Sequence, residues 1–461
     1  MRSLLKYKLE IFIVLLQLIS PLGNIGVILG STIIFYKVAF NRNLDLISLF
    51  ILLLPSIAFK ALPSSLDIDV NQQISGNWIK FYFSSVTNVF LVGPLAISTH
   101  LFAAFAVLVR LLINLKHLTN RVLMAFWIIC LLISIYGIYL AMGMGLKSDG
   151  GLTVGIRIVL SVGAILFPFS IEKSAFEKQI LVIVKMSLIL FILGLLNNQW
   201  IFVTAAFPAF IIFSENKKIW KFLGLVSLII MLYFSFTFTL KLTVLASFLL
   251  LMFYNEKKSD NFLFQTKLRK YLFFSFPILF MIFIAFYGGL IKIEKSNELI
   301  DRFIYKLIDD RGILWKYTFE FISNSDFFFV PAARNIIVYD YNVKGVGEWG
   351  VGAHNIYLEM ARHLGLFATI LLTIILGYYL LNSIKLIKPY IYLSKFFLAL
   401  FASYLVFGLT GNSLVYDGVG FFFWLIIGQI FQQGYNINIT NNHIENLNFV
   451  TNQKTTQQLT K

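Results

Sequence analysis

The stretch from His354 to Leu381 reads HNIYLEMARHLGLFATILLTIILGYYLL, and within it a long polar segment passes into an apolar helix. The polar segment carries Arg311, Gly345 and Gly347 ahead of His354. Almost all of the remaining chain is apolar enough to dissolve in lipid. We therefore expect the chemistry of the protein to lie in the polar segment, and the other helices to hold that segment in place.

The composition of the chain is typical of a membrane protein. Of its 461 residues, 59% are hydrophobic and 13% are charged, with a mean hydropathy of +0.82, whereas soluble domains carry about 25% charged residues. The single cysteine, Cys130, excludes a disulfide within the chain. The net charge of +16 lies in short loops between apolar segments, and this distribution argues against a nucleic-acid partner.

Apolar segments close to the ~20 residues that cross a bilayer recur along the chain. They predict an all-α polytopic integral membrane protein with about 12–14 transmembrane helices and one long, partly helical extracytoplasmic loop. After a pair of short helices within residues 11–36, the segments lie at about 44–62, 86–109, 122–145, 152–169, 179–196, 199–213, 219–236, 239–254, 271–291, 361–381, 392–410 and 415–433.

The charges of the loops predict the topology. Basic residues concentrate in the loops at 110–121, 214–221, 254–271 and 382–395, which places these loops on the cytoplasmic side. Acidic and basic residues nearly balance from 292 to 353, which places this long segment outside, and an even number of helices makes both termini cytoplasmic. The expected divisions are N-terminal transmembrane helices over 1–291, an extracytoplasmic catalytic loop over 292–360, C-terminal transmembrane helices over 361–433 and a disordered cytoplasmic tail over 434–461.

Arg311 begins an apolar helical pattern that continues with Trp315 and Phe319. A guanidinium at headgroup depth offers a planar, permanent positive charge to phosphate oxygens. Pairing with Asp309 or Asp310, or with a lipid headgroup, is the alternative that the spacing alone favours.

His354 follows two glycines, Gly345 and Gly347, that let the backbone approach a ligand or form an ordinary turn. An imidazole takes or gives a proton near neutral pH, which suits the activation of a hydroxyl group. A structural role is the alternative for a single histidine in a loop.

Two further cations, Arg157 and Lys241, fall in or beside expected transmembrane segments near the outer face. A charge there is costly and indicates function, whereas snorkelling of the side chain to the interface is the alternative. Glu359 and His363 are i, i+4 neighbours without the His-Glu-x-x-His spacing of a zinc site, so we expect no metal. The chain shows no nucleotide-binding motif, and we expect no cofactor.

Together these residues resemble the O-antigen ligase/polymerase superfamily of bacterial membrane glycosyltransferases. The resemblance rests on an arginine followed four residues later by tryptophan, a Gly-x-Gly, a His-Asn-x-Tyr-Leu sequence and a glycine that enters a transmembrane helix. These are Arg311, Trp315, Gly345, Gly347, His354, Asn355, Tyr357, Leu358 and Gly365. The resemblance implies a GT-C-like helix bundle in the bacterial inner membrane.

The resemblance also implies roles for individual residues. His354 would be the catalytic residue that activates the acceptor hydroxyl, and Arg311 would bind the donor diphosphate. Lys241 is the second diphosphate-binding candidate, although it stands where the family more often has an arginine and lacks the bidentate fork of one. The candidate substrate-binding residues are Arg157, Gly345, Gly347, Asn355 and Tyr357.

The function implied by the resemblance is polymerisation of undecaprenyl-diphosphate-linked repeat units into surface polysaccharide, by metal-independent glycosyl transfer at the outer face of the membrane. The expected partners are the carrier-linked glycan, membrane lipids and a chain-length regulator. An O-antigen ligase that transfers the glycan to lipid A–core is the first alternative. A lipid-linked oligosaccharide flippase is the alternative of another class, against which stands the lack of repeated halves.

Overall fold

The computed structural model describes part of the chain, and within this part the protein is predominantly helical, which confirms the expected helical class. The described residues are 4–18, 23–41, 43–57, 79–83, 88–92, 95–114, 121–143, 154–167, 171–196, 198–234, 238–252, 254, 278–284, 286, 301, 304–323, 354–386, 391–411, 414 and 420–435.

The elements follow one another along the chain in three groups. The first group contains η1 (Leu4–Tyr7), α1 (Lys8–Leu18), α2 (Gly23–Ala39), α3 (Leu46–Leu52), α4 (Leu54–Ile57), β1 (Ile79–Phe83), β2 (Asn88–Val92), β3 (Leu95–Ser98) and α5 (Thr99–Ile113). The second contains α6 (Arg121–Gly143), α7 (Val154–Gly163), η4 (Ala164–Leu166), α8 (Lys173–Ile192), α9 (Asn198–Thr204), α10 (Phe207–Ser214), α11 (Lys218–Phe234) and α12 (Phe238–Met252). The third contains η6 (Lys306–Gly312), α15 (Ile313–Ser323), α16 (Ile356–Leu364), α17 (Leu366–Leu386) and α18 (Ile391–Thr410), and residues 278–284 and 420–435 are also helical.

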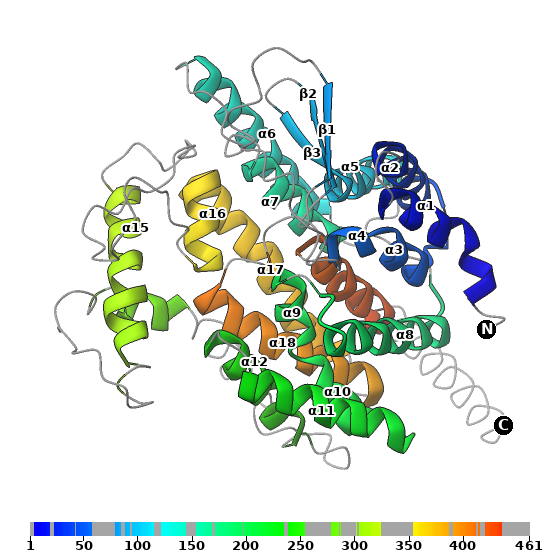
Figure 1. Ribbon diagram of the computed structural model, residues 1–461. Helices are drawn as coiled ribbons and strands as arrows, with labels where there is room; N and C mark the ends of the chain where they lie inside the picture. Colours follow the sequence, from blue (N-terminus) through cyan, green and yellow to red (C-terminus); the bar gives the residue numbers. More distant parts are fainter. Residues whose placement is uncertain are drawn as a thin grey trace, which may run out of the picture.

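The helices pack against one another as a bundle (Figure 1). Among them, α2 packs against α5, α6 against α17, α12 against α18 and α15 against α16. Aromatic side chains from distant parts of the chain meet in the core. The ring of Trp200 lies 5.5 Å from that of Phe422 and 5.8 Å from that of Phe50, and all three residues are fully buried. Burial of these large side chains is the main favourable contribution to packing in this part of the bundle.

A small antiparallel sheet is the departure from an all-helical chain. Strand β2 pairs with β1 and with β3, so that Phe90 lies opposite Phe81 on one side and Ile97 on the other. The sequence analysis expected one helix over 86–109, but the structure has β2 and β3 there before α5 begins at Thr99. The run Asn88-Val-Phe-Leu-Val favours a strand through its β-branched and aromatic residues, and Gly93-Pro94 interrupts any helix.

A second difference concerns the helix expected over 361–381. The structure ends α16 at Leu364 and begins α17 at Leu366, with Gly365 between them at a backbone φ of +81°. Only glycine adopts this conformation without steric cost, so it ends the short helix. The residues around His354 therefore belong to a separate nine-residue helix and not to the first turns of a long one.

Two helices in the described part of the chain are long and apolar enough to cross a membrane: Leu366–Ser383, with mean hydropathy 1.8, and Tyr392–Leu409, with mean hydropathy 1.6. Core helices of soluble proteins also meet this criterion, so length and composition alone do not place the chain in a bilayer. The shorter apolar helices are Ile25–Ala39, Phe102–Ile113, Arg121–Gly137, Gly155–Leu166 and Thr239–Met252.

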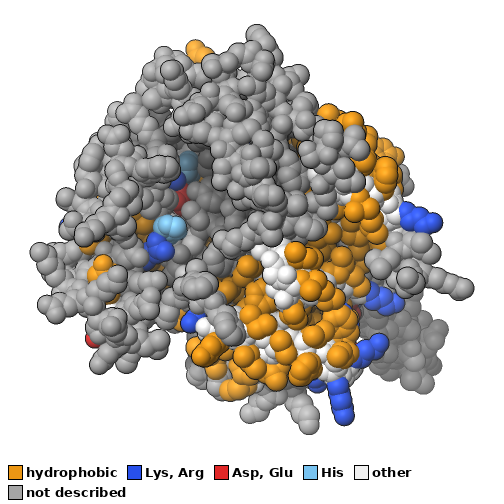
Figure 2. Space-filling model, viewed as in Figure 1, with side chains coloured by type: hydrophobic (Ala, Val, Ile, Leu, Met, Phe, Trp, Pro, Cys, Tyr) orange, Lys and Arg blue, Asp and Glu red, His pale blue; other side chains and the backbone are white. Residues whose placement is uncertain are grey.

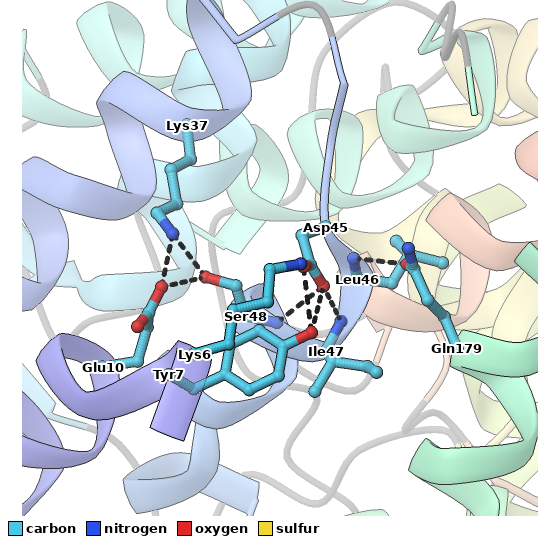
Figure 3. Close-up of polar contacts among 9 residues, drawn as sticks. All are labelled: Lys6, Tyr7, Glu10, Lys37, Asp45, Leu46, Ile47, Ser48 and Gln179. Atoms are coloured by element: carbon cyan, nitrogen blue, oxygen red, sulfur yellow. Dashed lines mark hydrogen bonds and ion pairs between the residues drawn. The ribbon is translucent and has the colours of Figure 1, made fainter. Parts of the chain in front are cut away.

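A buried ion pair joins the first three helices (Figure 3). The ammonium of Lys37 on α2 donates to Glu10 on α1 at 2.5 Å and to the hydroxyl of Ser48 on α3 at 2.6 Å. The Ser48 hydroxyl in turn donates to the same carboxylate oxygen of Glu10 at 2.6 Å. Each polar group thus meets partners on the two other helices, which compensates for the cost of burying it.

Asp45 is the N-cap of α3 and the centre of a neighbouring set of contacts (Figure 3). Its carboxylate accepts hydrogen bonds from Lys6 at 2.8 Å and from the hydroxyl of Tyr7 at 3.0 Å. The next residue, Leu46, donates its backbone N–H to Gln179 on α8 at 2.8 Å. The N-terminus, the start of α3 and the first half of α8 therefore lie together.

Other contacts join helix ends that are far apart in the sequence. Arg110, near the end of α5, donates to the carbonyl of Asn41, which follows α2. Lys395, at the start of α18, donates to the carbonyl of Phe213 at the end of α10 at 2.9 Å. Both pairs involve loops, or helix ends beside loops, that the sequence analysis assigns to the cytoplasmic side.

Large apolar side chains are exposed along one side of α11. They recur every three or four residues as Ile219, Phe222, Leu225, Ile229 and Tyr233, with exposed fractions from 48% to 77%. Figure 2 shows a broad apolar surface over the part of the molecule where Figure 1 places α11 and α12. A continuous apolar face of this kind is typical of a surface covered by lipid or by another protein.

Candidate functional site

The site around His354 is built on the first turn of α16. Asn355 is the N-cap of this helix, and its side-chain oxygen accepts hydrogen bonds from the backbone N–H groups of Tyr357 at 3.0 Å and Leu358 at 3.2 Å. These bonds satisfy two donors that have no partner within the helix. The side-chain nitrogen of Asn355 donates to the carbonyl of Leu409 in α18 at 3.5 Å. Asn355 is fully buried and ties the start of α16 to the end of α18.

His354 has a backbone φ of +49° and is, in the described part of the chain, the one residue other than glycine with a positive φ. The left-handed region costs a residue with a Cβ roughly 1–2 kcal/mol. Such conformations persist where the surrounding structure holds them, and they cluster at functional sites. Here the buried cap at Asn355 holds the next residue in the chain.

Arg311 lies in η6, a π-helix that continues directly into α15. π-helices account for well under 1% of residues in proteins and recur at functional sites. Trp315, one turn further on, is fully buried, and α15 packs against α16. The π-helix therefore places Arg311 just before the helix that packs against α16.

The structure brings Arg311 and His354 together. The pKa of the His354 imidazole is lowered from 6.5 to about 4, first by burial and then by the positive charge of Arg311. The charge of Arg362 acts in the same direction, whereas that of Glu359 opposes it. At neutral pH the imidazole is therefore uncharged, and one of its nitrogens is available to accept a proton.

Glu359, Arg362 and His363 form a buried cluster on α16. The carboxylate oxygen Oε2 of Glu359 accepts from Nε of Arg362 at 3.1 Å and from Nη2 at 2.7 Å. Nη2 of Arg362 also bonds Nε2 of His363 at 2.8 Å, and this Nε2 lies 3.3 Å from Oε2 of Glu359. The three side chains are 0%, 4% and 6% exposed, so the pair is screened little by water.

The carboxylate of Glu359 is charged in this cluster. Burial acts to raise its pKa, but the contact with His363 and the charge and hydrogen bonds of Arg362 outweigh burial and lower the pKa to about 2. Glu359 therefore supplies a permanent negative charge beside Arg362, and this charge also acts on His354.

The sequence analysis weighed Glu359 and His363 only as metal ligands and did not select Arg362. The available signal was their i, i+3 and i+4 spacing, which places all three on one side of a helix. The sequence did not show that this side is buried. Among the described residues, no three His, Cys, Asp or Glu side chains are grouped to hold a metal ion.

Tyr357 lies on the same helix and is almost fully buried. Its hydroxyl shares a hydrogen bond with the hydroxyl of Tyr404 on α18. Burial is the main reason why the pKa of Tyr357 rises to about 12, so its hydroxyl stays neutral. The structure gives both Tyr357 and Asn355 contacts that join α16 to α18, and their contact with a substrate stays a prediction.

Arg157 lies on α7, which packs against α16. The approach is closest at Gly155, where an added Cβ would lie 2.9 Å from the carbonyl oxygen of His363. A larger residue there would push the helices apart. The structure thus brings the helix of Arg157 to the end of the helix that begins beside His354.

Lys241 lies on α12, which packs against α18 and α10. Among the described residues, the positive charges that act on His354 are those of Arg311 and Arg362, not that of Lys241. The second cation near His354 is therefore Arg362, and a role for Lys241 in binding diphosphate stays a prediction. Gly345 and Gly347 lie outside the described residues.

The site reaches the surface of the molecule. Figure 2 shows histidine atoms beside Lys or Arg atoms, with acidic atoms further in, on the side where Figure 1 places α15 and α16. A neutral imidazole beside a guanidinium can accept a proton from a nucleophile while the cation stabilises negative charge on a leaving group.

No protein-family model matches the chain, and neither a curated protein nor a solved structure matches it.

Proposed function

We propose that the protein is a polytopic membrane glycosyltransferase that polymerises carrier-linked oligosaccharide repeat units at the outer face of the bacterial inner membrane. The observation that carries this proposal is the pairing of an uncharged His354 with the permanent cation Arg311. The strained backbone of His354 and the π-helix of Arg311 support a functional site there.

The position of the site along α18 supports a membrane-spanning arrangement. This helix has 20 residues and is therefore about 30 Å long, close to the apolar thickness of a bilayer. Lys395 near its start contacts Phe213, in the loop region expected to be cytoplasmic, and Leu409 near its end contacts Asn355. The apolar stripe on α11 is the surface that lipid would cover.

The proposed reaction uses the neutral imidazole of His354 and the guanidinium of Arg311 in one step. His354 takes the proton from the acceptor hydroxyl as its oxygen forms a bond to the anomeric carbon of the donor glycan. The bond between that carbon and the phosphate oxygen breaks, and undecaprenyl diphosphate leaves. Arg311 stabilises the negative charge that this oxygen gains. The free energy comes from the diphosphate leaving group.

The acceptor distinguishes the two reactions that this site can support. In a polymerase it is the sugar of another carrier-linked repeat, and in a ligase it is lipid A–core. We favour the polymerase, with a chain-length regulator as a further partner, because variation in repeat-unit chemistry makes polymerases numerous in this superfamily.

The test is a gel of the surface glycan from the source bacterium after deletion of the gene. We expect single-repeat glycan in the deletion strain and long chains after complementation with the wild-type protein. Complementation with His354→Ala or Arg311→Ala at matched protein level should leave single repeats. Arg110→Gln, at the other end of the bundle, serves as a matched control and should restore long chains.

Other results would replace this proposal. Long glycan that stays on the carrier would assign the ligase reaction. Repeat units trapped at the cytoplasmic face would assign transport. Normal glycan in the His354→Ala strain would exclude His354 as the base.

A further inference from the structure

Arg362 is a buried arginine with one unused donor group. Its Nε and Nη2 atoms bond Glu359, and Nη2 also bonds His363. Nη1 is buried as well, but among the residues that the structure describes none accepts a hydrogen bond from it. A buried charged donor without an acceptor is costly and rare in folded proteins, and it points to a ligand, ion or water as part of the site.

The hydrogen bonds of Arg362 hold the guanidinium in one orientation. Nη2 can only donate, so Nε2 of His363 must be the acceptor in the bond that they share. The edge formed by Nε and Nη2 is then occupied by Glu359 and His363. Because the guanidinium is planar and rigid, Nη1 is directed away from the carboxylate of Glu359.

The guanidinium of Arg362 lies close enough to His354 for its charge to act on the imidazole. A buried guanidinium donates its strongest hydrogen bonds to anionic oxygens, so a bound anion would satisfy Nη1 beside His354.

We infer that Arg362 binds an anionic oxygen of the substrate through Nη1, beside His354 and in reach of the charge of Arg311. The ligand is an oxyanion, either a phosphate oxygen or a sugar carboxylate. The inference rests on the proposed function for the identity of the substrate, since the diphosphate carrier and an acidic sugar are the two sources of such an oxygen. Binding of the anion itself does not depend on catalysis.

The test measures binding of two probes, inorganic pyrophosphate and glucuronate, to the purified full-length chain in lipid nanodiscs by isothermal titration calorimetry. The double variant Glu359→Gln with Arg362→Gln should bind about 10- to 100-fold more weakly than the wild-type protein, the range for loss of a charged hydrogen bond. The double variant leaves no buried charge without its partner, so it is expected to fold when Arg362→Gln alone does not.

Arg110→Gln is the matched control because Arg110 is also buried and its Nε also has no acceptor among the described residues, but it lies at the other end of the bundle, at the carbonyl of Asn41 and away from His354. Its affinity for both probes should equal that of the wild-type protein. A loss for pyrophosphate alone assigns the phosphate, and a loss for glucuronate alone assigns the carboxylate. Equal affinities of the double variant and the wild-type protein for both probes would overturn the inference.

The outcome is separate from that of the proposed function. If the double variant loses probe binding and still restores long glycan in vivo, the anion site is supported and the proposed glycosyltransferase function is not. If the double variant binds the probes as the wild-type protein does and His354→Ala fails to restore long glycan, the proposed function is supported and the anion site is not.

Discussion

Two buried clusters of charged residues stand at different ends of this protein, and they differ in how completely their groups are partnered. In the N-terminal cluster, Glu10 meets Lys37 and Ser48, and each of these also contacts the other. In the α16 cluster, Glu359 holds Arg362, but Nη1 of Arg362 has no acceptor among the described residues. The first cluster joins helices, whereas the second has a hydrogen-bond donor that a ligand can use.

The backbone conformation next to the two clusters also differs. Asp45 begins α3 with an extended conformation and an ordinary cap. Asn355 caps α16 equally well, but His354 before it is held at a positive φ, and Arg311 opposite lies in a π-helix. Backbone strain and a buried donor without an acceptor together mark the functional cluster, since a purely structural one gains nothing from either.

Replacement of His354 by glycine gives the largest expected effect. Glycine adopts a φ of +49° without strain, so stability should be kept, while loss of the base should reduce glycosyl transfer by about 10²–10⁴-fold. The measurements are transfer to a carrier-linked acceptor in nanodiscs and thermal unfolding of the same sample. Full activity with raised stability would show that the strain at this position serves no catalytic purpose.

Glu10→Gln tests the N-terminal cluster. Loss of one member of a buried pair leaves Lys37 uncompensated and should lower the free energy of unfolding by about 3 kcal/mol. The activity of the folded fraction should not change, because this cluster joins α1, α2 and α3 only. Denaturation monitored together with activity per folded molecule checks this, and a specific loss of activity would mean that the two clusters are coupled.

The pH profile of transfer depends on the charges around His354. Because the pKa of His354 is about 4, the base stays unprotonated as pH falls through 6.5, and activity should decline only near pH 4. In Arg311→Gln, loss of the neighbouring positive charge raises the pKa, so the decline should move to higher pH. Rates of both proteins from pH 4 to 8 check the direction, and a decline at the same pH in both would exclude this coupling.

The smallest expected effect concerns Asn355. Asn355→Ala removes the cap of α16 and should cost about 1 kcal/mol of stability, whereas Asn355→Ser keeps a cap and should cost a few tenths of that. Thermal unfolding of the two variants gives the comparison. If Asn355→Ser loses activity while its stability is unchanged, Asn355 contacts the substrate, as the sequence analysis predicts.

The regular patterns of the chain predicted much of the fold. Long apolar runs predicted α6, α8, α11 and α18 with ends within a few residues of those observed, apart from the start of α8. The predicted helices differ from the observed elements where a glycine or proline interrupts a long apolar segment. Gly93-Pro94 and Gly365 each interrupt an apolar segment, and the structure changes element at both places.

The residues of the candidate site were likewise predicted in part from the sequence and found in part only in the structure. The family resemblance selected Arg311 and His354, and the structure brings them together. Arg362 was not selected, and the structure shows that it is buried beside Glu359. Lys241 was selected on sequence position, but the cation that acts on His354 from α16 is Arg362.

By itself, the sequence determined the helical class, the apolar helix over 392–410 and the residue types that can transfer a proton or bind an anion, because these follow from local composition and spacing. Tertiary structure alone decided that one side of α16 is buried, that Nη1 of Arg362 has no acceptor among the described residues, and that His354 is uncharged. Burial and the distance between charges depend on which helices meet, and residues far apart in the chain set both.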